Sequence, residues 1–210
     1  MKKLLFIISI LTIFSTKAQY KKAELHFRDG TIKTGLAKHP FASSKLKYKV
    51  EKESDPVIYS YKKVDRFFFT TENKGDEVKT EYQYKIVLRQ VTPKLMEVYL
   101  RGKVSLYGIE KTNSGYGMAM GGFGGSGGHV AFSAGAGGTS TTYYIGKTDS
   151  DVVEKVTLRE KLSFRRFKKI VLKHFKNCNE LIEKTKNKNK YLKKETIFGI
   201  VKFYNKNCKN

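Results

Sequence analysis

Apolar and polar residues alternate along much of the chain between residues 23 and 106, with the two-residue period of a half-buried β-strand. The apolar members form short groups, which are Ala23, Leu25 and Phe27; Leu46, Tyr48 and Val50; Val57, Tyr59 and Tyr61; Tyr82, Tyr84, Ile86 and Leu88; Met96, Val98 and Leu100; and Val104 and Leu106. Short strands at this spacing predict an antiparallel β-sheet region with the character of a small SH3-like barrel or a sandwich.

Turn signals separate several of these groups. Asp29-Gly30 supplies the positive backbone dihedrals of a tight hairpin, after which the strand pattern resumes at Ile32. A second turn is expected at Arg101-Gly102, and residues 141–145 and 152–156 have the pattern of strands that complete the sheet.

From Leu162 onward the apolar period changes to about 3.6 residues, the repeat of an amphipathic helix. Ser163 is a suitable N-cap for a first helix. Its predicted apolar face holds Phe164, Phe167, Val171, His174, Phe175 and Cys178. We therefore predict an α+β protein in which the β-sheet region is followed by a short C-terminal helical bundle.

Two further helices complete that bundle. A short one would carry Leu181 and Ile182, and the polar run 184–190 is predicted as a loop. A final helix would place Ile197, Val201, Tyr204 and Cys208 on one stripe.

The two cysteines lie on the apolar faces of two helices that must fold back on each other. Cys178 and Cys208 are thirty positions apart, and we predict a disulfide between them. Two buried free thiols are the alternative. A redox role would require a close Cys-X-X-Cys pair, which the sequence lacks.

The N-terminus has the pattern of a secretory signal peptide. Lys2 and Lys3 precede an apolar run from Leu4 to Phe14, and the segment ends in Ser15-Thr16-Lys17-Ala18. The run is short for a membrane span, so a retained anchor is the weaker interpretation. We predict cleavage after Ala18 and a periplasmic or secreted protein, where a disulfide can persist.

Three regions result from these patterns: a signal peptide at 1–18, a β-rich domain at 19–160 and a basic helical region at 161–210. The β-rich domain is interrupted at residues 114–140, which hold 11 of the 18 glycines and almost no charge. Glycine at this density predicts a flexible loop. The alternative is a membrane or partner contact made by its apolar residues.

Several short motifs match catalytic patterns without their structural context. Residues 124–128 read Gly-Gly-Ser-Gly-Gly, the Gly-X-Ser-X-Gly of a nucleophile elbow, but in a glycine-rich tract this match is expected by chance. The four histidines show no ligand spacing. The sequence therefore predicts no enzyme, no catalytic or metal site, no cofactor and no small-molecule substrate.

Charge is the feature that calls for a functional explanation. The chain has 42 Lys and Arg against 19 Asp and Glu, a formal net charge of +23, and residues 161–210 hold 16 of the cations with three acids. On the first helix, the predicted solvent-facing cations are Arg165, Arg166, Lys168, Lys169, Lys173 and Lys176. Such a surface attracts polyanions with a strength that salt screens. An ordinary solvated face is the alternative.

Several segments together resemble a protein family. They are Asp29-Gly30-Thr31-Ile32-Lys33-Thr34-Gly35, Tyr59-Ser60-Tyr61-Lys62-Lys63-Val64, Gly102-Lys103-Val104-Ser105-Leu106-Tyr107, Tyr143-Tyr144-Ile145 and Tyr204-Asn205-Lys206-Asn207-Cys208. In this order, after a signal peptide, they resemble a large group of uncharacterised exported proteins of Bacteroidota. The resemblance implies a β-rich N-terminal part and a helical part with two cysteines, and it implies no activity.

Two functions are expected from these observations. The first is a non-enzymatic cell-envelope protein that binds an anionic partner through its basic helices, the partner being lipopolysaccharide, anionic lipid or extracellular nucleic acid. The second is a structural or assembly module that contacts an outer-membrane protein through the glycine-rich loop.

Overall fold

The chain folds into ten strands followed by three helices. The computed structural model describes residues 20–38, 44–73, 75–112, 139–158, 160–186 and 196–208. The strands are β1 (Lys21–Phe27), β2 (Ile32–Lys38), β3 (Lys45–Lys49), β4 (Val57–Ser60), β5 (Val64–Asn73), β6 (Asp76–Val87), β7 (Pro93–Leu100), β8 (Val104–Thr112), β9 (Thr139–Lys147) and β10 (Val152–Thr157), and the helices are α1 (Phe164–His174), α2 (Asn179–Lys186) and α3 (Ile197–Asn207). The protein is therefore α+β, as the sequence predicts.

Strands β1 to β5 form one half of the sheet, in the order β5-β1-β2-β3-β4 with antiparallel neighbours. The predicted hairpin between β1 and β2 is confirmed. Gly30 has a φ of 87°, and the Asp29 carboxylate accepts a hydrogen bond from the Thr31 amide at 2.9 Å. Leu25, Phe67 and Tyr48 are among the buried residues of this half.

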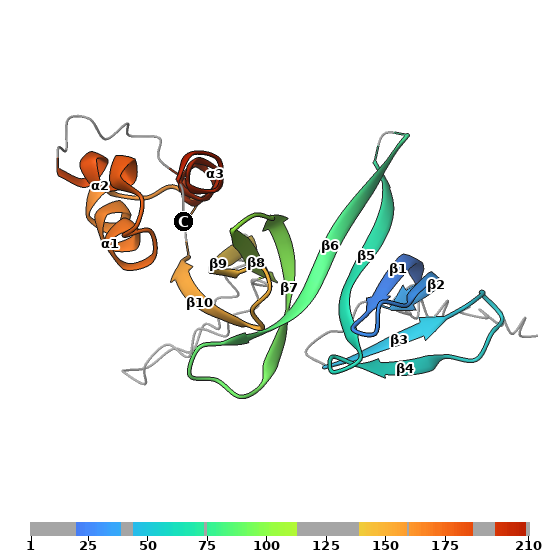
Figure 1. Ribbon diagram of the computed structural model, residues 1–210. Coiled ribbons are helices and arrows are strands. Elements are labelled where there is room, and N and C mark those ends of the chain that lie inside the picture. Colours follow the sequence, from blue (N-terminus) through green and yellow to red (C-terminus); the bar gives the residue numbers. More distant parts are fainter. Residues whose placement is uncertain are drawn as a thin grey trace, which may run out of the picture.

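Strands β6 to β10 form the other half, and their pairings close into a ring. Each strand is antiparallel to the next, and β10 pairs with both β9 and, in parallel, β6. Asp151 and Val153 carbonyls accept the amides of Ile86 and Leu88, each at 2.8 Å. The long β5–β6 hairpin rises between the two halves, as Figure 1 shows.

The three helices lie at the end of the molecule away from β1 to β4 (Figure 1). They share a hydrophobic core with the sheet, because Leu106, Tyr143 and Ile145 of β8 and β9 join the buried residues of the helices. The helical contributors include Phe167, Ile170, Val171, Phe175, Leu181, Ile197, Ile200, Val201 and Tyr204. The helical region therefore packs on the sheet, and its predicted division from the β-rich domain at residue 160 stays a prediction.

Asn205 on α3 fastens the helix to the start of β8. Its side-chain oxygen accepts the Val104 amide at 3.0 Å, and its side-chain nitrogen donates to the Val104 carbonyl at 2.8 Å. Gly102 leaves the space that this amide occupies, because a Cβ there would lie 2.2 Å from the Asn205 side-chain nitrogen.

The predicted disulfide is confirmed: Cys178, before α2, is bonded to Cys208, after α3. Both cysteines are buried in the shared core. The bond therefore holds the ends of two helical segments together inside an apolar environment.

Other details differ from the sequence prediction. The alternation pattern missed β5, because Phe67, Phe68 and Phe69 are consecutive and hide a two-residue period. Val50 lies beyond the end of β3 and is exposed. Residues 184–186, predicted as a loop, form the last part of α2, because the buried Thr185 continues its apolar face.

The predicted face of the first helix also needs correction. Helix α1 ends at His174, and Phe175 and Cys178 are buried although they lie beyond the helix. Ile170, which the prediction omitted, is buried on the helix itself. The short connection after α1 turns the chain while keeping both residues in the core.

Replacing both Cys178 and Cys208 with Ser is expected to lower the free energy of unfolding by roughly 3–4 kcal/mol, because the disulfide closes a long loop in the unfolded chain. Urea unfolding followed by circular dichroism measures the change. Reducing agent should destabilise the natural protein to a similar extent and leave the double variant unaffected. Equal stability of variant and natural protein under oxidising conditions would contradict this role.

Replacing Asn205 with Ala is expected to cost about 1–3 kcal/mol of stability, because the part-buried Val104 amide and carbonyl lose their partners. Asn207→Ala is the matched control, since among the described residues Asn207 donates to the Phe203 carbonyl of its own helix, at an exposed position. Urea midpoints of the two variants test the prediction. If they agree within error, Asn205 does not fasten α3 to β8.

Candidate functional site

Helix α1 separates a buried apolar stripe from a basic surface. Phe167, Ile170 and Val171 face the core. The six cations predicted for this region are all exposed, namely Arg165, Arg166, Lys168, Lys169, Lys173 and Lys176. The 3.6-residue repeat of the apolar residues enforces this separation, since every third or fourth position is taken by the core.

Two hollows lie beside α1 and share Lys173 and His174 in their walls. The first has a volume of about 550 Å³ and is lined by residues of β9, β10, the β9–β10 turn and the chain around the end of α1, together with Leu88, Val104 and Tyr204. The second has a volume of about 350 Å³ and is lined by β10, the residue after it and α1. We call the two together the α1–β10 groove. Its cations are Lys147, Lys155, Arg166, Lys169, Lys173 and Lys176.

The groove brings together four of the six predicted cations and adds two that the sequence did not single out. Arg165 and Lys168 are not among the residues that line it. Lys147 ends β9 and Lys155 lies within β10. Lysines on strands look like an ordinary solvent-facing side of a sheet, so only the packing of α1 against β10 identifies these two.

Glu154 is the only carboxylate among the described residues that line the groove. It accepts a hydrogen bond from the Lys173 ammonium at 2.5 Å, and this bond is the main reason why the pKa of Glu154 is lowered. The positive charge of Lys173 is therefore compensated by Glu154. Among the described residues, Lys147, Lys155, Lys169 and Lys176 have no carboxylate within ion-pair distance, so the groove keeps a positive surplus.

Arg166 is held toward β10 by a side-chain contact. Its guanidinium donates to the Thr157 hydroxyl at 3.3 Å. Thr157 is buried and Arg166 is exposed, so the bond fixes the guanidinium at the groove edge while leaving it open to solvent. A fixed guanidinium can offer its remaining donors to a phosphate or carboxylate.

His174 forms part of both hollows. Desolvation lowers its pKa, although Glu154 at 4.0 Å acts in the opposite direction. At neutral pH the imidazole is therefore uncharged, and its protonation would add a positive charge to the groove.

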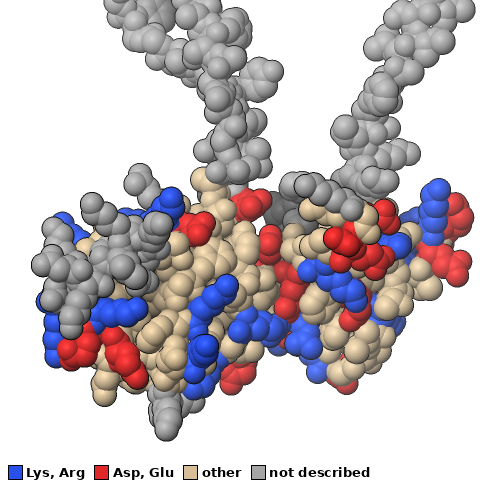
Figure 2. Space-filling view, turned by 90° about the horizontal axis from the view of Figure 1, so that it is seen from above, with Lys and Arg blue, Asp and Glu red and all other residues tan. Residues whose placement is uncertain are grey.

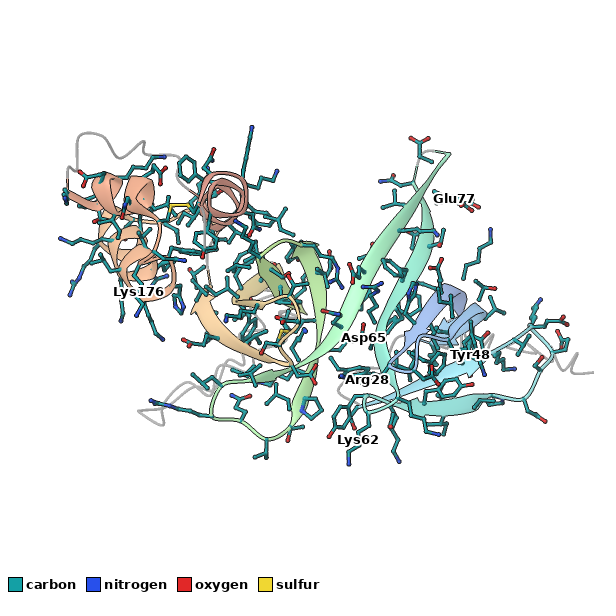
Figure 3. All side chains as sticks on the ribbon, in the orientation of Figure 1. Arg28, Tyr48, Lys62, Asp65, Glu77 and Lys176 are labelled. Atoms are coloured by element: carbon teal, nitrogen blue, oxygen red, sulfur yellow. A yellow bond between two sulfur atoms is a disulfide. The ribbon has the colours of Figure 1, made fainter. Side chains whose placement is uncertain are left out.

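Contacts from β6 and from the β1–β2 turn hold the turn that leads into the β10 wall. Lys85 on β6 is buried, its pKa is lowered by desolvation, and its ammonium donates to the Ser150 carbonyl at 2.7 Å. Arg28 of the β1–β2 turn pairs with Asp151 at 3.1 Å. Figure 3 labels Arg28 at the junction of the two halves and Lys176 at the helical end. The turn before β10 is thus fixed by contacts to both halves.

The face seen from above has a different charge pattern. There, Lys and Arg atoms are interspersed with Asp and Glu atoms over both halves of the molecule (Figure 2). Mixed charges of this kind largely compensate each other beyond a Debye length. The positive surplus in the α1–β10 groove therefore indicates a binding site more strongly than the mixed charges of this face do.

Cys178, Glu180 and Cys208 are the one group of three metal-ligating residue types that come together in the described part of the chain. Both sulfur atoms belong to the disulfide, so they are not available as thiolate ligands. None of the helices among the described residues has the length and apolarity to cross a membrane.

Two expectations fall outside the described ranges. The signal peptide at 1–18 lies there, and so does most of the glycine-rich segment 114–140, including its Gly-X-Ser-X-Gly match. Only residues 139 and 140 of that segment are described, and they begin β9.

Comparison of the chain with protein-family models, with curated proteins and with solved structures found no match. The resemblance to exported proteins of Bacteroidota therefore stays a prediction.

The His174 environment predicts a pH dependence of stability. Because its pKa is lowered in the folded protein, the unfolded chain takes up the proton first, and stability falls as pH drops from about 7.5 to about 5.5. Replacing His174 with Gln should remove this part of the pH dependence of stability. Urea midpoints across this pH range measure it, and parallel profiles of the variant and the natural protein would contradict it.

Proposed function

We propose that this protein is an exported, non-enzymatic component of the cell envelope that binds an anionic partner through the α1–β10 groove and the basic surface of α1. The observation that supports the proposal most directly is the groove itself, where six cations from β9, β10, α1 and the segment after α1 share the lining with one carboxylate among the described residues. Sequence-distant cations gathered on one concave surface attract a polyanion more strongly than cations spread over the molecule.

Export is the second element of the proposal. The N-terminal pattern of the first 18 residues favours it, with cleavage after Ala18 and a periplasmic or secreted location. A disulfide buried in the core is compatible with an oxidising compartment, where such bonds persist.

The proposed scaffold is a pair of small, strongly curved β units with a helical bundle. Support for barrel character comes from the cyclic pairing of β6 to β10, and support for SH3-like character in the first half comes from the order β5-β1-β2-β3-β4. The helices would serve as a bundle that covers β8 and β9 and presents its lysines to the partner.

The binding chemistry would be diffuse rather than bidentate. Five of the six groove cations are lysines, which act as mobile point charges, whereas Arg166 alone can form a two-donor contact with one phosphate or carboxylate. Affinity should therefore depend steeply on salt and weakly on the detailed arrangement of the anion.

Replacing Arg166, Lys169 and Lys176 with Glu tests the proposal. Taking about 1 kcal/mol per cation lost, binding of the exported protein to soluble polyphosphate at low salt should weaken roughly 100-fold. Lys173 is left unchanged because it pairs with Glu154. Isothermal titration calorimetry at two salt concentrations measures the affinity.

The matched control replaces three exposed lysines of the first half, Lys47, Lys62 and Lys63, with Glu. This variant has the same net charge as the groove variant, and Figure 3 labels Lys62 far from the helical end. An equal loss of affinity in both variants would show that only total charge matters. A partner recovered from envelope extract that resists high salt would favour the assembly module instead.

A further inference from the structure

Exposed leucine and valine side chains lie among the cations of the α1–β10 groove. Leu88 and Val152 line the larger hollow together with Lys147 and Lys176. Leu158, which is 55% exposed, lines the smaller hollow. Exposed apolar side chains that share one hollow and are surrounded by polar residues are typical of interaction sites.

The apolar surface continues onto the outer side of α1. Leu172 is 46% exposed and follows Lys168 and Lys169 by four and three residues, so these side chains are neighbours on the helix surface. Lys169 also lines the smaller hollow beside Leu158. Lys169 is therefore next to both leucines, with Leu158 in the hollow and Leu172 one turn along the helix.

From this combination we propose that the anionic partner is a lipid bilayer surface, on which the lysines contact phosphate head groups while Leu158 and Leu172 enter the interfacial region. The inference rests on the proposed function, since it names the class of anion that the groove binds. Cations next to exposed apolar side chains match the two layers of an anionic membrane surface, which has charge at the head groups and hydrocarbon a few ångströms below.

Nucleic acid fits the same surface less well. Proteins that bind single strands stack bases on aromatic side chains, and sequence-reading proteins place Arg or Asn against base edges. Among the described residues that line the groove, the aromatic side chains are His174 and Tyr204, and the Tyr204 hydroxyl donates to Asn177 at 3.1 Å. The exposed leucines would remain in water beside a nucleic acid.

The test compares two double variants. One carries Leu158→Gln and Leu172→Gln, and the control carries Ile32→Gln and Ile58→Gln. The control side chains are 56% and 55% exposed, compared with 55% and 46% for Leu158 and Leu172, and they lie on the first half of the sheet. All four positions are open to solvent, and circular dichroism checks that each variant folds.

The probes are phosphatidylcholine vesicles that contain about one third phosphatidylglycerol, vesicles of phosphatidylcholine alone, and soluble polyphosphate. Vesicle co-sedimentation at low salt should show binding to the anionic vesicles only. The Leu158 and Leu172 double variant should bind these vesicles about tenfold more weakly, because two apolar side chains no longer enter the interface. Its affinity for polyphosphate, and both affinities of the control variant, should be unchanged.

Two results would overturn the inference while leaving the proposed function intact. One is binding to polyphosphate without binding to anionic vesicles, and the other is vesicle binding that the leucine replacements do not weaken. If neither probe binds at low salt, the proposed function itself fails together with the inference.

Discussion

The dual pairing of β10 is the constraint on which the arrangement of this protein depends. Val152 and Val153 at its start pair with β6, and Glu154, Lys155 and Thr157 pair with β9, so different parts of β10 are held by the two neighbouring strands. The buried Lys85 strengthens this closure by donating to the Ser150 carbonyl in the turn before β10. Glu154 and Lys155 pair with Ile145 and Tyr144 of β9, so one wall of the groove is part of the sheet.

The second wall depends on the shared core of helices and sheet. Phe167 and Val171 fix the rotation of α1 about its axis, which directs Arg166, Lys169 and Lys173 toward β10. The disulfide and the Asn205 contact act at a distance from these cations, because they hold the connection after α1 and the helix α3 against β8. Apolar packing, the disulfide and the Asn205 hydrogen bonds therefore hold in place a surface that carries a positive surplus.

The elements that follow a regular period could be predicted from the sequence, and those that depend on long-range packing could not. Alternation identified most strands, and the 3.6-residue repeat identified α1 and α3 because single faces of these elements are buried. Three consecutive phenylalanines concealed β5, since Phe68 lies on the opposite face from Phe67 and Phe69. The parallel pairing of β6 with β10 joins residues more than sixty positions apart and leaves no local pattern.

The residues of the candidate site were likewise predictable only where they are close together in the sequence. The cations of α1 were predictable because they are close together in the sequence and excluded from the apolar face. Lys147 and Lys155 were not, since their relevance comes only from the packing of α1 beside β10. Leu158 and Leu172 likewise look unremarkable in the sequence, and their exposure beside Lys169 is a property of the folded chain.

In the proposed function, the surface between α1 and β10 binds the anionic partner. A residue-resolved NMR titration of the protein with soluble polyphosphate tests this proposal, because each backbone amide reports its own environment. We predict amide shift changes concentrated in β10 and α1, which disappear at high salt. Changes spread evenly over exposed lysines, or concentrated in β1 to β4, would contradict the account.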